Sequence, residues 1–277
     1  MTRFALFAVP LVLLAASAKA QQVPNAPLGT TPADRSTQGP AVSKMTPRQE
    51  AEMNADILMA RKEYEAAAKV YQTILIDDPR NVKILNTVGI AFQQMGDVAT
   101  AARYYKLALR YDKNDFSAPN NLGTIESGQH RYGKAIKYYK QSISKGNAVA
   151  TVYANLGYAY CSNKEYVKGM EAFGQALKLD PTVFDPKNGA GTIVQERSSP
   201  DPAGLHYALA KSYAKVGDAE RAARYLKQAR DEGYKLYRNA EKDPDFAKVI
   251  KDRRVQEVLH VQPAYAAEPA PPKPATN

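Results

Sequence analysis

The sequence predicts an all-α solenoid, a stack of similar helix pairs, and three periodic features of the chain support this prediction. Small residues recur every 34 residues, at Ala55, Gly89, Gly123 and Gly157. Twelve residues after each of them stands a second small residue, at Ala67, Ala101, Ala135 and Gly169. Four residues further on stands an aromatic residue, at Tyr71, Tyr105, Tyr139 and Phe173. A fixed period of this length is typical of repeat proteins.

Four contiguous units follow from this period, at residues 48–81, 82–115, 116–149 and 150–183. We number each unit so that the first small residue is at position 8, the second at position 20 and the aromatic residue at position 24. Apolar residues recur at intervals of three and four, as at Leu85, Val88 and Phe92 and again at Tyr105 and Ala108, which is the pattern of amphipathic helices. We expect two helices per unit to cross at the small residues, with the aromatic ring filling the space left by those at position 20.

A fifth unit at residues 203–236 restores the same frame after an interruption, so residues 184–202 form an insertion of 19 residues. Beyond it, Asp243-Pro244 is an N-cap followed by a first-turn proline, which predicts one or two capping helices over residues 237–261. Two segments are too polar or too rich in proline to bury much apolar surface, which predicts a flexible lead-in and a disordered tail. These segments are residues 21–47 and 262–277.

At these positions the chain resembles the tetratricopeptide repeat family, which has small residues at positions 8 and 20, aromatic residues at 11 and 24, and proline at 32. The chain departs from the family pattern at Lys62, where the turn usually has glycine, and at Glu126, which occupies position 11. The second and third units also lack the closing proline. The resemblance implies a right-handed α-solenoid of about five helix pairs. It further implies a non-catalytic protein–protein interaction scaffold that binds partner proteins or peptides in a concave groove.

The N-terminus has the organisation of a secretory signal peptide over residues 1–20. Arg3 precedes an apolar run at residues 4–16, and residues 18–20 form a small-x-small cleavage motif. The run is too short for a transmembrane anchor, although retention without cleavage is an alternative. We therefore expect an exported protein, periplasmic or secreted, that begins at Gln21 and does not span the membrane after cleavage. Removing two basic residues with this segment leaves 36 basic and 28 acidic residues, a formal charge of +8 in place of +10.

The sequence offers no catalytic, cofactor or metal site. His130, His206 and His260 are scattered over the chain without ligand spacing, and the chain has neither a phosphate-binding glycine loop nor a nucleophile elbow. Glu126 and His130 are four residues apart and form a possible acid/base pair. A solvated pair at a helix end is the favoured alternative, and His206 is expected to be a packing residue. We therefore expect no enzyme activity and no cofactor.

The resemblance places the binding groove on the first helix of each unit. The expected groove residues are Lys83, Asn86, Ile90, Gln93, Asn120, Asn121, Thr124, Asn155, Tyr158, Tyr207 and Lys211. Their amide and hydroxyl groups suit hydrogen bonds to a peptide backbone. The lysine-based clamp with which some relatives hold a C-terminal carboxylate is missing. Cys161 at position 12 is expected near the inner wall, so a mixed disulfide with a partner remains an alternative to a free thiol.

A stripe of basic residues on the second helix of the third unit predicts a second surface of interest. Its members are Arg131, Lys134, Lys137 and Lys140. Such a stripe suits anionic lipid, a polyanionic glycan or an acidic partner, and a merely solvated face is the alternative. Export from the cytoplasm argues against nucleic acid. The sequence thus predicts an interaction scaffold of the bacterial cell envelope, with an accessory of polysaccharide or cell-wall assembly, contacting an anionic polymer, as the alternative.

Overall fold

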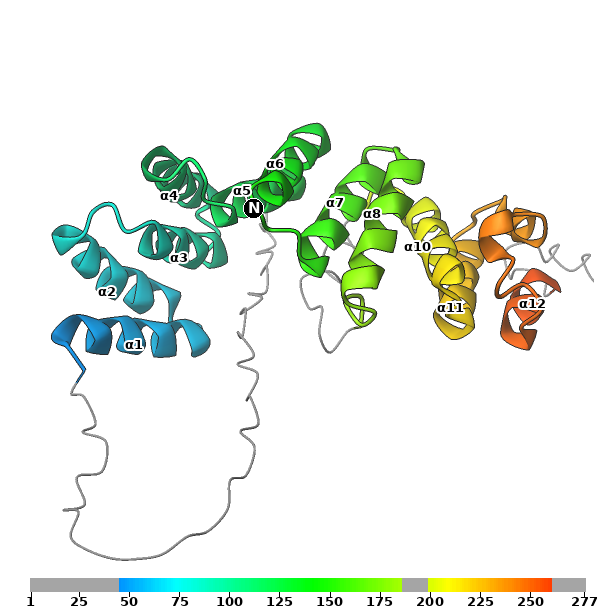
Figure 1. Ribbon diagram of the computed structural model, residues 1–277, viewed down its shortest axis with the longest axis horizontal. Helices are drawn as coiled ribbons and strands as arrows, with labels where there is room; N and C mark the ends of the chain where they lie inside the picture. Colours follow the sequence, from blue (N-terminus) through cyan, green and yellow to red (C-terminus); the bar gives the residue numbers. More distant parts are fainter. Residues whose placement is uncertain (1–44, 186–198, 261–277) are drawn as a thin grey trace, which may run out of the picture.

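The computed structural model describes residues 45–185 and 199–260, and within these ranges the chain consists of helices and connecting turns without a β-strand (Figure 1). Four helix pairs follow one another along the stack in the order of the chain (Figure 1). They are α1 (Pro47–Ala60) with α2 (Tyr64–Asp77), α3 (Val82–Gln94) with α4 (Val98–Tyr111), α5 (Ser117–Gly128) with α6 (Tyr132–Ser144), and α7 (Ala150–Ser162) with α8 (Tyr166–Leu179).

A fifth pair and a C-terminal segment complete the stack. The pair is α10 (Pro202–Val216) with α11 (Ala219–Asp231), followed by the 3₁₀ helices η1 (Tyr237–Glu241) and η2 (Pro244–Phe246) and by α12 (Arg253–His260). Each helix of the five pairs packs against its neighbours in this order, and first helices of adjacent units also touch, as α5 does with α3 and α7. This arrangement confirms the predicted all-α solenoid. In the part of the chain that the structure describes, no helix is long and apolar enough to cross a membrane.

Several expectations fall wholly or mainly outside the described residues. These are the signal peptide at residues 1–20, nearly all of the lead-in at 21–47, the centre of the insertion at 184–202, and the tail at 262–277. The two ends of the insertion are described. Phe184 is 3% exposed and meets Phe173 edge to face, with ring centroids 5.3 Å apart. Asp185 accepts three hydrogen bonds from the guanidinium of Arg221, at 3.3, 3.1 and 2.9 Å, and so ties the start of the insertion to α11.

The turn between the two helices of each unit passes through a left-handed residue at position 15. Glycine occupies this position in the second and fifth units, where Gly96 and Gly217 have φ of 84° and 86°. The other three units place a side chain there, with φ of 63° at Lys62, 58° at His130 and 63° at Lys164. A residue with a Cβ is strained in this conformation by about 1–2 kcal/mol. All five turns therefore have the same backbone geometry, but glycine, the residue that adopts it without strain, is present only in the second and fifth units.

The packing of the aromatic residues differs from the expectation drawn from the sequence. The rings at position 24 lie against the glycines at position 8, since a Cβ at Gly123 would come within 2.7 Å of Tyr139 Cε1. The small residue at position 20 faces the stretch of the first helix from position 8 to position 12: a Cβ at Gly169 would meet Cys161 Sγ at 2.4 Å and the Gly157 carbonyl oxygen at 3.2 Å. Positions 20 and 24 are one helical turn apart, so they contact successive parts of the first helix.

The C-terminal segment covers the end of the stack with two 3₁₀ helices and α12. Phe246 of η2 is fully buried, and Val255 and Leu259 of α12 are 0% and 1% exposed. These residues belong to one apolar cluster with residues of α7, α8, α10 and α11. The capping segment is therefore part of the largest core of the described chain.

Candidate partner-binding groove

The middle of the groove is formed by the first helices of the second and third units. Lys83 is exposed, and Ile90, Asn121 and Thr124 are half-buried. Asn120 Nδ2 donates to Asn121 Oδ1 at 3.3 Å, and the Thr124 hydroxyl donates to the Asn120 carbonyl at 3.2 Å. The amide and hydroxyl groups of Asn120, Asn121 and Thr124 thus lie side by side on α5, while Lys83 and Ile90 lie on α3, which contacts α5.

Two expected groove residues of the second unit are engaged in internal contacts. Asn86 is 7% exposed, and its Nδ2 donates to Asp115 Oδ2 at 3.1 Å. Asp115 in turn accepts from the Ala118 backbone N–H at 2.8 Å, so Asn86 supports the start of α5. Gln93 Oε1 accepts a hydrogen bond of 2.9 Å from the hydroxyl of Tyr105. Asn86 is therefore a link between two units, which corrects its assignment as a partner-binding residue.

The groove residues of the fourth unit are mostly interior. Tyr158 is 2% exposed and meets Phe173 and Phe184 edge to face, with centroids 5.2 and 6.1 Å apart. Cys161 is 1% exposed, and burial, with a smaller effect of the Asp201 carboxylate, raises the pKa of its thiol far above the ordinary range. Asn155 is half-buried. Tyr158 is thus a core residue, which corrects its assignment to the groove, and Asn155 is the groove residue of this unit with accessible surface.

The fifth unit's groove position is occupied by the chain's own C-terminal segment. Tyr207 lies 6.1 Å from Phe246 of η2 between ring centroids and also stacks on Tyr234, just before η1, at 4.5 Å. Lys211 lies between two carboxylates of the capping segment, at 2.7 Å from Asp243 and 3.0 Å from Asp245. Its side chain is 16% exposed. Both residues serve the cap, which corrects the expectation that they face a partner.

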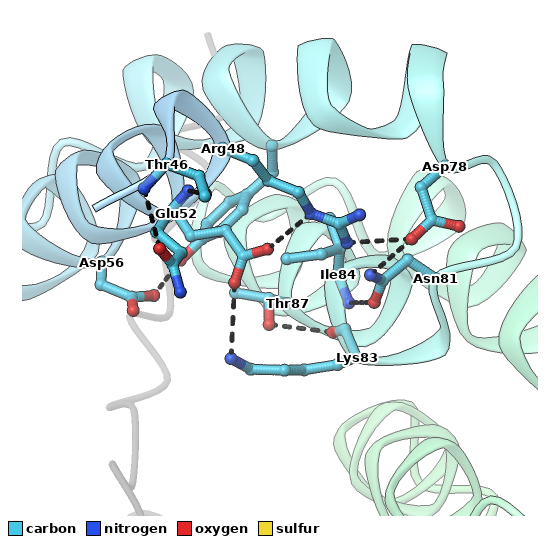
Figure 2. A network of polar contacts seen from close by, with 11 residues as sticks. Thr46, Arg48, Glu52, Asp56, Asp78, Asn81, Lys83, Ile84 and Thr87 are labelled. Carbon is cyan, nitrogen blue, oxygen red and sulfur yellow. Dashed lines mark hydrogen bonds and ion pairs between the residues drawn. The ribbon is translucent and has the colours of Figure 1, made fainter. Parts of the chain in front are cut away.

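The first unit contributes acidic residues that sequence reasoning did not include. Glu52 and Asp56, at positions 5 and 9, are one helical turn apart on α1, and Glu52 reaches Lys83 of α3 (Figure 2). Glu52 pairs with Lys83 Nζ at 3.8 Å, and Arg48 bridges Glu52 at 3.1 Å and Asp78 at 2.9 Å. Asp56 accepts from the buried Tyr71 hydroxyl. Applying the same frame to the first unit would have found these residues.

Titratable groups outside the groove form no catalytic arrangement in the described ranges. Glu126 pairs with Arg131 rather than with His130, whose Nδ1 lies 2.7 Å from the Tyr132 hydroxyl. His206 is 5% exposed, and its Nδ1 lies 2.5 Å from Glu232 Oε2. Among described residues, no group of three or more His, Cys, Asp or Glu side chains is placed to hold a metal ion.

The structure removes one residue, Arg131, from the predicted basic stripe. Arg131 turns toward Glu126 and Gln129, so it is neutralised locally. Lys134, Lys137 and Lys140 are exposed along α6. The stripe of the third unit is thus made of these three lysines, without Arg131.

Comparison with known proteins agrees with the repeat frame. Tetratricopeptide repeat family models match residues 52–118 and 86–143, and another matches residues 150–183. Residues 52–143 and 150–183 of the chain are therefore tetratricopeptide repeats. These repeats support a role as a protein-interaction scaffold, the general role of this fold. No curated protein matches the chain.

Solved structures of tetratricopeptide repeat type are also similar to the chain. A crystal structure of MamA has 22% identity and a TM-score of 0.46, covering 65% of this chain and 95% of that one. YrrB, described as having an unusual peptide-binding site, has 17% identity and a TM-score of 0.44, covering 70% and 91%. The thermophilic protein TTC0263 from Thermus thermophilus has 17% identity and a TM-score of 0.47, covering 77% and 100%.

Proposed function

We propose that the protein is an exported scaffold of the bacterial cell envelope, which holds an extended segment of a partner protein against the first helices of its second to fourth units. The observation that carries this proposal is the run of accessible groups at Lys83, Ile90, Asn121, Thr124 and Asn155. It is bounded by the carboxylates of the first unit and by the capping segment on the fifth. The helices are fixed by the packing described above, so binding would require little ordering of the scaffold.

The groove is tested by the double variant Asn121→Ala with Asn155→Ala in affinity capture from envelope extracts. A lost hydrogen bond costs about 0.5–1.5 kcal/mol, so capture should weaken by roughly five- to a hundred-fold if the two costs add. The matched control reverses Lys134 and Lys137 to Glu and should change capture much less. Tolerance of the Asn changes together with loss of capture in the control would contradict the groove proposal.

Export rests on the signal-peptide motif and has its own test. Intact-mass analysis of the protein from its native cells should give a chain that begins at Gln21. A mass that includes residues 1–20 would contradict the proposed soluble envelope protein, without bearing on the groove.

A second candidate function is supported by the exposed Lys134, Lys137 and Lys140. An accessory of polysaccharide or cell-wall assembly would contact an anionic polymer through them. Binding to a soluble anionic glycan that falls steeply with salt would favour this function, because exposed charges are screened by salt. Salt-tolerant peptide binding would favour the scaffold.

A further inference from the structure

The second helices of the second and third units together present six exposed cations. These are Arg103, Lys106 and Arg110 of α4 and Lys134, Lys137 and Lys140 of α6, which we call the two-helix basic face. Arg103 and Lys137 share position 22 of the repeat, and Lys106 and Lys140 share position 25. Equivalent positions of stacked repeats have similar orientations, so α4 and α6 direct these cations to the same side of the stack.

The two-helix basic face has little opposite charge close to it in the described chain. Neither α4 nor α6 contains an acidic residue, and none of the six cations forms an ion pair with a described carboxylate, unlike Lys69 on α2 or Lys168 on α8. Acidic residues stand at the two ends of α4, and the pKa of Asp97 is lowered by its hydrogen bonds with Thr100 and, to a smaller extent, by the charge of Arg103. Asp97 accepts from the Thr100 backbone N–H at 3.0 Å, and Asp112 accepts from that of Asn114 at 2.8 Å. The face therefore keeps a net positive charge, with Asp97 offsetting part of the charge of Arg103.

Two exposed aromatic residues lie where α4 ends and α5 begins. Tyr111 is 41% exposed and Phe116 is 46% exposed. The Ser142 hydroxyl of α6 donates to the Phe116 carbonyl at 2.7 Å, and Lys145 Nζ donates to the Lys113 carbonyl. These bonds hold the connection between α4 and α5 against the C-terminal end of α6. Both aromatic residues thus lie in or beside the connection held at this end of α4 and α6, and the guanidinium of Arg80 lies 5.8 Å from the centroid of the Tyr111 ring.

We infer that the two-helix basic face binds the surface of an anionic phospholipid membrane. Lysine and arginine are attracted to anionic headgroups, and exposed aromatic rings insert at the level of the headgroups. A soluble anionic polymer would use the cations alone and would leave Phe116 in water. This inference goes beyond the proposed scaffold function, because the contact uses the second helices and leaves the groove on the first helices free.

Vesicle co-sedimentation of the purified protein tests the inference. Vesicles of phosphatidylglycerol with phosphatidylcholine should bind the protein, and phosphatidylcholine alone should bind it far more weakly. Each cation near an anionic bilayer strengthens binding by about fivefold, so neutralising four of them should weaken binding by roughly six-hundredfold if the four contributions add. The face variant carries Arg103→Gln, Lys106→Gln, Lys137→Gln and Lys140→Gln. The control has the same net charge but removes exposed cations elsewhere, by Lys178→Gln, Lys235→Gln, Lys242→Gln and Lys251→Gln.

The control variant should bind within about threefold of the unchanged protein, since charges beyond a Debye length of about 8 Å are largely screened at physiological salt. Phe116→Ser should weaken vesicle binding by about tenfold through lost apolar contact. Circular dichroism melts establish that each variant is folded, and the milder pair Lys137→Gln with Lys140→Gln should still weaken binding by roughly twenty-five-fold.

Three results would overturn the inference. One is equal loss of binding in the face variant and its control. Another is equal binding to neutral and anionic vesicles. The third is binding to a soluble polyanion such as dextran sulfate, insensitive to Phe116→Ser, without binding to anionic vesicles. None of these results bears on partner capture by the groove, so the two proposals fail separately.

Discussion

Gly89 lies against the ring of Tyr105, so that a Cβ built on Gly89 would come within 2.4 Å of Tyr105 Cε1. The fourth unit repeats the relationship, with Gly157 against Phe173 at 2.4 Å. The two rings are fully buried. The aromatic residue of the second helix thus packs on the bare backbone of the first, which sets how closely the two helices of a unit approach.

Replacing Gly89 with Ala should destabilise the protein, because the new methyl group would displace a ring that has no free space around it. Overpacking of this kind costs about 1–3 kcal/mol. The matched control is Gly174→Ala in the middle of α8, where a Cβ would meet no atom within 4 Å. That change should stabilise by about 0.5–1 kcal/mol, as alanine does in a helix interior. Urea unfolding measures both, and equal effects of the two changes would contradict the packing described.

The left-handed conformation at position 15 predicts that glycine is stabilising at this position. Lys164 has φ of 63° and an exposed side chain. Lys164→Gly should raise the free energy of unfolding by about 0.5–1 kcal/mol, because relief of backbone strain exceeds the entropy that glycine gains in the unfolded chain. Ala99→Gly, at an exposed helical position of α4, should instead lower it by about 1 kcal/mol. Thermal melts of the two variants that shift in the same direction would refute this account.

The repeat period predicts the fold well, because each unit buries its apolar face on the next unit. Substitutions within one unit, such as Lys62 or Glu126, do not change this stacking. The period identifies the small positions 8 and 20, but it does not say which of them meets the ring at position 24. The structure assigns the ring to position 8. Contact between Gly169 and the first helix could be predicted from residue size, whereas its particular neighbour, Cys161, depends on the crossing geometry.

The groove was harder to predict, because its limits depend on contacts between distant segments. Nothing in the local pattern around Lys211 indicates that Asp243 and Asp245 will fold back onto it. The frame likewise does not reveal that Arg131 pairs with Glu126 across the left-handed turn at His130. Both outcomes are set by ion pairs whose partners lie in other turns or elements, and a repeat frame contains no information on such pairing.

The ion pairs of Lys211 predict that replacing Lys211 lowers the free energy of unfolding more than replacing its neighbour Lys215. Lys211 is 16% exposed and contacts two carboxylates, whereas Lys215 is 56% exposed and contacts Asp245 at 3.0 Å. Lys211→Gln should lower the free energy of unfolding by about 1–3 kcal/mol, because it leaves carboxylates with incomplete partners. Lys215→Gln should cost less than about 1 kcal/mol, as exposed pairs do. Equal costs in chemical denaturation would show that the capping segment does not depend on Lys211.

The same contacts predict a loss of stability in acid. Burial raises the pKa of Asp245, but hydrogen bonds from Lys211 and Lys215 outweigh burial, and the pKa is lowered overall. A carboxylate with a lowered folded pKa contributes stability above its unfolded pKa of about 3.9 and loses this contribution as the pH falls through the folded pKa. Unfolding measured from pH 7 to 2.5 should therefore show a decline below about pH 4. Asp245→Asn should flatten part of that decline, and parallel curves for the two proteins would contradict the assignment.

The burial of Cys161 predicts an inert thiol in the folded protein. Burial and the nearby Asp201 carboxylate raise the pKa of this thiol, so the reactive thiolate is scarce and reagents have no access to it. A disulfide reagent at pH 8 should label the folded protein at least about a hundredfold more slowly than the protein in denaturant. The control places an exposed thiol nearby, by Lys164→Cys in a Cys161→Ala background, and should react as fast folded as unfolded. Rapid labelling of Cys161 in the folded protein would contradict its burial and would favour the alternative of a mixed disulfide with a partner, because the thiol would then be accessible at the surface.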